Sequence, residues 1–116
     1  MTQERENMAS RVLNPASLVN YQEGSVVSRM LVFKKTGTIT VFAFAKGEEL
    51  FEHTAPYDAI VQVIEGSGIF TIKDEKFSLN TGEILIMPAN IPHAVYAEEN
   101  FKMMLTMIHE KDTLKM

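Results

Sequence analysis

The chain has 116 residues, of which 46% are hydrophobic and 22% charged, which suits one domain with a buried core. Its formal net charge is −4 and it carries no basic cluster, which argues against nucleic acid as a partner. Cysteine is absent, so disulfides and thiolate metal sites are excluded.

The N-terminal residues Met1 to Arg11 are polar and charged, without the apolar segment of a signal peptide. No apolar run approaches the ~20 residues that a membrane-spanning helix needs. We therefore expect a cytoplasmic protein that contacts no membrane. Residues 1–13 are expected to form a flexible N-terminal segment, and residues 14–116 a single domain, because no linker or repeat divides them.

A short N-terminal helix is predicted at the start of this domain. Asn14 is a typical helix N-cap, and Pro15 suits the first helical position. The helix would run from Ala16 to Tyr21 in one or two turns. Glu23 and Gly24 would end it.

From Val26 onward, apolar residues alternate with the period of β-strands. In the segment 38–45, Ile39, Val41 and Ala43 share one face while Phe42 and Phe44 share the other, so this strand is expected to be covered on both sides. Turn-forming residues separate the segments. The predicted strands are residues 26–33, 38–45, 59–65, 69–73, 77–79, 84–87, 93–97 and 101–109.

About eight or nine short strands with closely spaced turns predict an all-β fold, an antiparallel sandwich or barrel. The strands are not separated by helical segments of ten residues or more, which argues against parallel βαβ units.

Two histidines lie in segments that resemble the two sequence motifs of the cupin superfamily. Gly47, His53 and Gly66 match the first motif, Gly-x5-His-x-His-x(3,4)-Glu-x6-Gly, in order and spacing. Gly82, Pro88 and His93 match the second, Gly-x5-Pro-x-Gly-x2-His-x3-Asn. The resemblance, to small single-domain proteins of the cupin 2 conserved-barrel type, covers roughly residues 26–108. It implies a double-stranded β-helix, or jelly-roll barrel, with a pocket between its sheets.

The chain departs from the family at other motif positions. Ala55 stands for the second histidine, Ala59 for the glutamate and Ala97 for the final asparagine. Asn90 replaces a glycine, which is tolerable because both residues adopt positive φ. Of the four positions that bind metal in typical cupins, only His53 and His93 are kept.

One hypothesis is that His53 and His93 bind a divalent metal such as Fe, Mn, Ni or Zn, since imidazole is a common ligand. A third ligand would have to come from elsewhere. We considered Asp58, Glu52, Gln62 and His109; strand alternation turns the first three away, and His109 lies at a barrel end. On the strand at residues 101–109, Lys102 indicates that the face opposite His109 is solvated.

The other hypothesis is a metal-free pocket for a small molecule at one barrel mouth. Ala55 and Ala59 would leave apolar space, and His53 and His93 would bind or act as acid–base groups. Gln62 and Arg29 are further candidates for substrate binding. Arg29 would clamp a carboxylate; alternatively it is a solvated or dimer-interface charge.

The sequence leaves the activity open between an isomerase-like or dioxygenase-like enzyme and a binding module. It favours a homodimer, because the strands at residues 26–33 and 38–45 carry apolar residues on both faces and one barrel buries only one. The family resemblance implies a dimer through these first strands.

Overall fold

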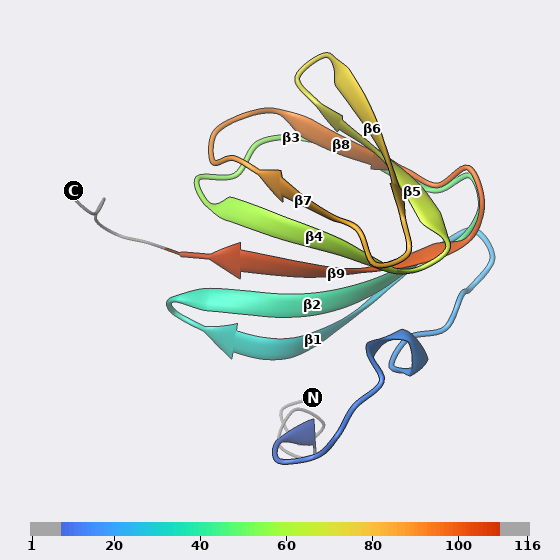
Figure 1. Ribbon diagram of the computed structural model, residues 1–116, viewed down its shortest axis with the longest axis vertical. Helices are drawn as coiled ribbons and strands as arrows, with labels where there is room; N and C mark the ends of the chain where they lie inside the picture. The colour runs from blue at the N-terminus through green and yellow to red at the C-terminus, as the bar shows by residue number, and fades with distance from the viewer. Residues whose placement is uncertain (1–7, 110–116) are drawn as a thin grey trace.

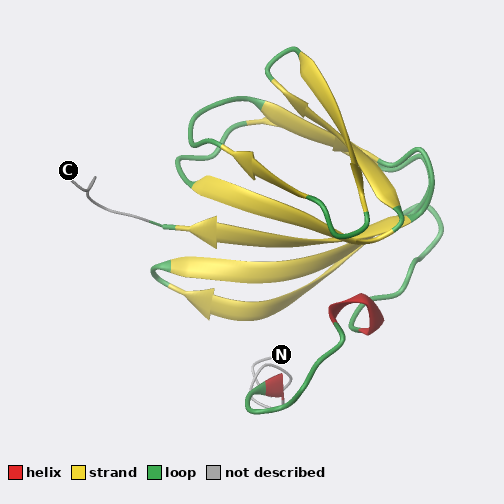
Figure 2. Ribbon diagram, viewed as in Figure 1, coloured by secondary structure: helices red, strands yellow, loops and turns green. Residues whose placement is uncertain are grey.

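The computed structural model describes residues 8–109, and it is built almost entirely of β-strands (Figures 1 and 2). A 3-10 turn, η1, spans Pro15–Ser17. The strands are β1 (Val26–Lys34), β2 (Gly37–Phe44), β3 (Glu49–His53), β4 (Asp58–Glu65), β5 (Ser67–Ile72), β6 (Glu75–Asn80), β7 (Ile84–Met87), β8 (His93–Tyr96) and β9 (Phe101–Ile108).

The strands form two antiparallel sheets that enclose one hydrophobic core. The larger sheet has the order β1-β2-β9-β4-β7, and the smaller has the order β3-β8-β5-β6. Phe70 and Val95 of the small sheet and Val61 of the large sheet belong to one buried cluster. At its centre the ring of Phe101 stacks on Phe44, with centroids 4.8 Å apart. This two-sheet jelly-roll confirms the predicted all-β class.

Part of the second face of the large sheet is also buried, as the alternation of β2 predicted. Phe42 and Phe44 face the core between the sheets, whereas Val41 and Ala43 lie in a second cluster on the outer face. The outer cluster is covered by the chain's own residues before β1, including Leu18, Val19 and Tyr21. We call residues 15–22 the strap. The strap therefore supplies part of the cover that the sequence attributed to a second subunit.

The prediction of an N-terminal helix was wrong, because only a three-residue 3-10 turn forms. Its start was predicted well: Asn14 caps the turn by accepting a hydrogen bond from the Ala16 amide at 3.2 Å. The carbonyl of Ala16 accepts a hydrogen bond from Lys102 Nζ at 2.6 Å instead of an amide one turn later. An extended strap also lets Val19 bury itself against the sheet, which a helix would not allow as readily.

Lys102 anchors the strap, which corrects the expectation that its face is solvated. It is only 7% exposed, and its ammonium lies 4.9 Å from the centre of the Tyr21 ring and 3.6 Å from Glu65 Oε2. The Tyr21 hydroxyl donates a hydrogen bond to the same Glu65 oxygen at 2.5 Å. Burial and the Glu65 carboxylate raise the pKa of the Tyr21 hydroxyl, so it stays protonated. We call Tyr21, Glu65 and Lys102 the clamp.

Strand β3 was not among the strands predicted from the sequence. Four of its five residues, Glu49, Phe51, Glu52 and His53, are exposed, so its sequence shows no alternation of buried and solvated positions. It forms because it pairs with β8 at the edge of the small sheet. This pairing places His53 directly opposite His93.

Candidate functional site

His53 and His93 face each other across neighbouring strands at one end of the barrel. They are direct partners in the β3–β8 pairing, and their ring centroids are 4.4 Å apart at an interplanar angle of 69°. His93 lies on the same side of β8 as Val95, which is buried in the core. The structure thus brings together the two residues that the motif spacing singled out, on the core-facing side of the small sheet.

Two loops are joined where they approach the pair. The Asn90 amide donates a hydrogen bond to the Ala55 carbonyl at 2.7 Å, which links the loop before β8 to the loop after β3. Asn90 has φ of 64°, a left-handed conformation, as expected of a residue that replaces the motif glycine. The Lys73 amide also binds the Pro92 carbonyl at 2.9 Å. These contacts fix the backbone on both sides of the imidazoles.

Each imidazole is oriented by a carbonyl of its own strand or loop. Nδ1 of His53 lies 2.9 Å from the Phe51 carbonyl, and Nδ1 of His93 lies 3.2 Å from the Ile91 carbonyl. A carbonyl only accepts, so a neutral ring here carries its proton on Nδ1 and leaves the lone pair on Nε2. Both rings therefore present Nε2 as an acceptor or ligand atom.

Burial keeps His93 neutral over a wider pH range than a solvated histidine. It is 8% exposed, and loss of solvent lowers its pKa below the usual 6.5. The Ile91 carbonyl opposes this shift, and a positive charge on His53 would lower the pKa further. His53 itself is exposed to solvent. The pair therefore joins a buried neutral base to an accessible imidazole.

The residues considered as a third metal ligand are occupied elsewhere or face away. Asp58 accepts a hydrogen bond from the Ala89 amide at 2.8 Å. His109 binds the Lys35 carbonyl through Nδ1 at 3.3 Å and stacks on Tyr57, with ring centroids 4.0 Å apart. Over residues 8–109, no three His, Cys, Asp or Glu side chains are grouped so as to hold a metal ion. The described donor set thus does not complete the metal site implied by the family.

The residues predicted to bind substrate are divided between the two faces of the large sheet. Ala59 is buried in the core between the sheets, and Ala55 lies in the loop held by Asn90. Gln62 pairs with Met104, which contacts the outer cluster, and Arg29 pairs with Val41 of that cluster. The structure therefore does not bring Gln62 and Arg29 to the histidine pair.

Two methionines and one aromatic pair near this end of the barrel were not assigned to a site by sequence reasoning. Ala59 pairs with Met87 on one side and Met107 on the other, and both methionines pack in the core. The stack of Tyr57 on His109 joins a loop to the end of β9. Strand alternation indicates which methionines face inward, whereas no local sequence pattern predicts the stack of Tyr57 on His109.

The comparisons with known proteins agree with this architecture. The model of the cupin domain matches residues 40–109 of the chain. The chain belongs to the cupin superfamily. No curated protein matches the sequence.

Solved structures show how far the resemblance extends. A protein of unknown function from Streptococcus pyogenes shares 36% identity, with a TM-score of 0.83 over 89% of this chain and 90% of the other. A cupin superfamily protein from Desulfitobacterium hafniense shares 30% identity, with a TM-score of 0.82 over 87% and 93%. A cupin 2 conserved barrel domain protein from Leptotrichia buccalis shares 48% identity, with a TM-score of 0.78 over 80% of this chain. The match spans only 45% of that longer chain.

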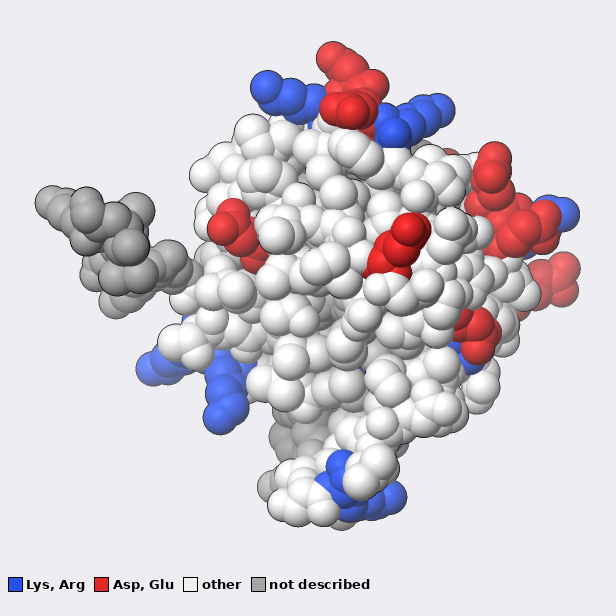
Figure 3. Space-filling view, in the orientation of Figure 1, with Lys and Arg blue, Asp and Glu red and all other residues white. Residues whose placement is uncertain are grey.

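Two features bear on the expected surroundings of this cupin. Across residues 8–109, no helix is long and apolar enough to cross a membrane. On the face shown in Figure 3, basic side chains are scattered and do not gather in a patch. Cytoplasmic location and the absence of nucleic acid among its partners stay predictions.

Proposed function

We propose that this cupin binds a small organic molecule at the barrel end that carries His53 and His93. The observation on which the proposal rests is the orientation of the pair, two imidazoles 4.4 Å apart with each Nδ1 facing a backbone carbonyl. Both Nε2 atoms are left to accept hydrogen bonds from a ligand hydroxyl, amide or carboxylic acid. Ala55 and Ala59 stand where the family has a histidine and a glutamate, so two larger polar side chains are missing from this end of the barrel.

The pair is also suited to moving a proton. A neutral His93 accepts a proton through Nε2, and the solvent-exposed His53 lies beside it. An isomerase-like reaction would use the pair in this way, whereas a binding module would use it only to orient the ligand. Turnover of a bound ligand distinguishes the two.

A ligand screen tests the proposal. Protein prepared without an affinity tag is screened by thermal shift against sugars, carboxylic acids and aromatic alcohols. A ligand of the site raises the melting temperature of the wild type as its concentration exceeds Kd, and His53→Gln/His93→Gln abolishes the rise. A ligand whose stabilisation survives in the double variant binds elsewhere, and absence of any stabilising compound contradicts the proposal.

A divalent-metal enzyme, dioxygenase-like or isomerase-like, is the second candidate. It is favoured by the fixed Nδ1 atoms, since ligating histidines usually donate their other N–H to a carbonyl or carboxylate. It is opposed by the incomplete donor set, because metal sites normally need at least three protein ligands. Metal analysis decides: stoichiometric Fe, Mn, Ni or Zn in the wild type, lost in the double variant, establishes the metal enzyme.

We also propose a homodimer, with its interface on the part of the large sheet that the strap leaves uncovered and not on the first strands that the family resemblance implies. Ile84, Ile86 and Ile108 are 58%, 58% and 49% exposed, and their strands β7 and β9 flank β4. Exposed aliphatic side chains on one face of a sheet are typical of an interface. Light scattering should give twice the chain mass of 13.1 kDa, and Ile86→Lys should give the monomer. Phe51→Lys, a change at an exposed residue of the other sheet, is the control.

A further inference from the structure

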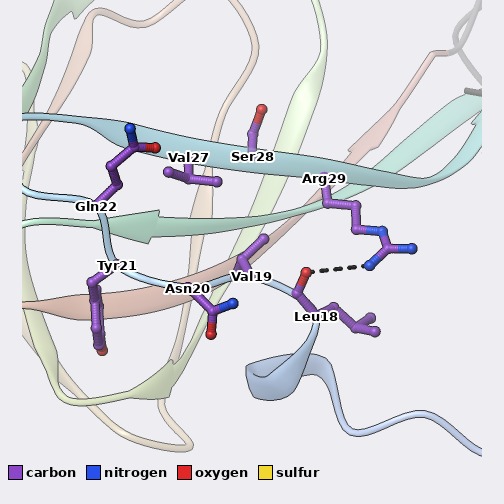
Figure 4. A pocket seen from close by; sticks show the side chains of 8 residues that line it. All are labelled: Leu18, Val19, Asn20, Tyr21, Gln22, Val27, Ser28 and Arg29. Carbon is purple, nitrogen blue, oxygen red and sulfur yellow. Dashed lines mark hydrogen bonds between the residues drawn. The ribbon is translucent and has the colours of Figure 1, made fainter.

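A cavity lies on the outer face of the barrel, between the strap and strand β1. Its volume is about 480 Å³, within the range of small-molecule sites. Figure 4 shows the strap alongside β1, with Val19 and Val27 between them and Arg29 at one end. The lining residues are Leu18, Val19, Asn20, Tyr21, Gln22, Val27, Ser28 and Arg29. Arg29 is the one formally charged side chain among them.

Within residues 8–109, the guanidinium of Arg29 has no carboxylate partner. Its one hydrogen bond is a long contact from Nη1 to the Leu18 carbonyl, at 3.5 Å. Nε is buried and has no hydrogen-bond partner in the described chain. Buried N–H groups nearly always have a partner, and a guanidinium binds carboxylates through two parallel N–H groups. Nε and Nη2, which lie on one edge of the guanidinium, thus have no anionic partner in the described chain.

The walls of this cavity are held in place on both sides. The clamp anchors the strap through Lys102, which binds the Ala16 carbonyl, and through the Tyr21 hydroxyl on Glu65. Val19 is buried against the outer cluster, and β1 is paired with β2 along its length. A cavity with anchored walls binds a ligand at a smaller cost in conformational entropy than one formed by free loops.

We propose that this cavity is a binding site for a small organic carboxylate with an apolar body. Arg29 pairs with the carboxylate, Val19, Val27 and Leu18 contact the apolar body, and the amides of Asn20 and Gln22 bind its polar substituents. A single arginine among neutral residues suits a monoanion better than a phosphate dianion, which commonly binds a cluster of cations or a helix N-terminus. The site is separate from the histidine pair, because Arg29 lies on the outer face of the large sheet and His93 faces the core.

The test uses amide NMR spectra of the full-length protein titrated with benzoate and, as its neutral counterpart, benzamide. Benzoate should give saturable shifts concentrated at residues 18–22 and 27–29, and benzamide should not. Arg29→Gln should weaken benzoate binding at least about tenfold, and Arg29→Lys less, because lysine keeps the charge without the paired N–H groups. His53→Gln/His93→Gln should bind benzoate as the wild type does, which separates this site from the proposed function.

Three results would overturn the proposal. The first is benzoate binding that is lost in the double histidine variant and kept in Arg29→Gln, which places the ligand at the histidine pair. The second is equal binding of benzamide, or shifts that do not saturate. The third is a dimer that Arg29→Gln converts to a monomer while benzoate binds neither form, which makes Arg29 an interface residue. If Arg29→Gln does not fold, Arg29→Lys supplies the comparison, since it retains the long aliphatic stem and the charge.

Discussion

The clamp and the histidine pair both lie close to the core of this protein. They differ in how many of their polar atoms have hydrogen-bond partners within the described chain. In the clamp, Lys102 donates to the Ala16 carbonyl and faces Glu65, and Tyr21 donates to Glu65. In the histidine pair, both Nδ1 atoms face carbonyls, and no protein hydrogen bond is found for either Nε2 within residues 8–109.

We therefore interpret the clamp as structural, whereas the histidine pair is the place where we propose that a ligand binds. The ammonium, the hydroxyl and one carboxylate oxygen of the clamp have partners inside the fold, and these contacts hold the strap. In the proposed ligand site, the Nε2 atom of each histidine would bind another molecule.

The largest expected effect comes from removing the cation of the clamp. Lys102→Met should lower the free energy of unfolding by about 2–3 kcal/mol, because it removes a charge-assisted hydrogen bond and leaves Glu65 without its cation. Urea denaturation followed by circular dichroism measures this loss. Residues 15–22 should also become more exposed to hydrogen exchange, since the strap loses its anchor.

The matched control is Lys46→Met. Lys46 pairs with Glu99 at the same distance of 3.6 Å, but these side chains are 68% and 76% exposed. An exposed pair of this kind contributes about 0–1 kcal/mol, so the control should be almost neutral. Equal losses in the two variants would contradict the structural interpretation of the clamp.

A smaller effect is expected at the clamp hydroxyl. Tyr21→Phe removes the hydrogen bond to Glu65 while keeping the ring beside Lys102, so it should cost about 1 kcal/mol in the same denaturation experiment. The ring supplies the cation–π contact and part of the cover over the outer cluster, both of which phenylalanine retains. A loss as large as that of Lys102→Met would mean that the hydroxyl, rather than the ammonium, holds the strap.

Local sequence patterns predicted most of the fold because alternation reports directly which side chains share a face. Residues 84–87 were predicted at the observed bounds of β7, and the two faces of β2 were separated correctly. Alternation does not say what covers a face. Lys102 was expected in solvent because the residues that bury it lie in the strap, more than 80 residues earlier in the chain. Strand β3 was not predicted, because its mostly exposed residues do not alternate between buried and solvated positions.

The candidate site was predicted in part for the same reason. The family resemblance implied that His53 and His93 lie together, and the β3–β8 pairing makes them direct partners. The placement of Arg29 depends on which face of β1 turns inward, and two apolar faces in one strand leave that undecided. The orientation of each imidazole by a carbonyl two residues earlier is a feature of the folded backbone and could not be read from residue types.

The smallest effect, and the one that tests the pair most directly, is on stability as a function of pH. Because burial lowers the pKa of His93 in the folded state, the unfolded chain binds this proton more tightly. The free energy of unfolding therefore falls as pH drops through the unfolded value of 6.5 toward the lower folded pKa. Well above pH 6.5, His93 is neutral in both the folded and the unfolded state, so it adds no pH dependence to the free energy of unfolding.

His93→Gln isolates this contribution, since glutamine has a similar polarity but does not titrate. The free energies of unfolding of the wild type and the variant are measured by urea denaturation between about pH 8 and pH 5. Their difference should be constant at the alkaline end and shift in favour of the variant as the solution is acidified. A shift in favour of the wild type would mean that His93 gains a proton on folding. That outcome would remove the neutral Nε2 on which the proposed ligand site depends.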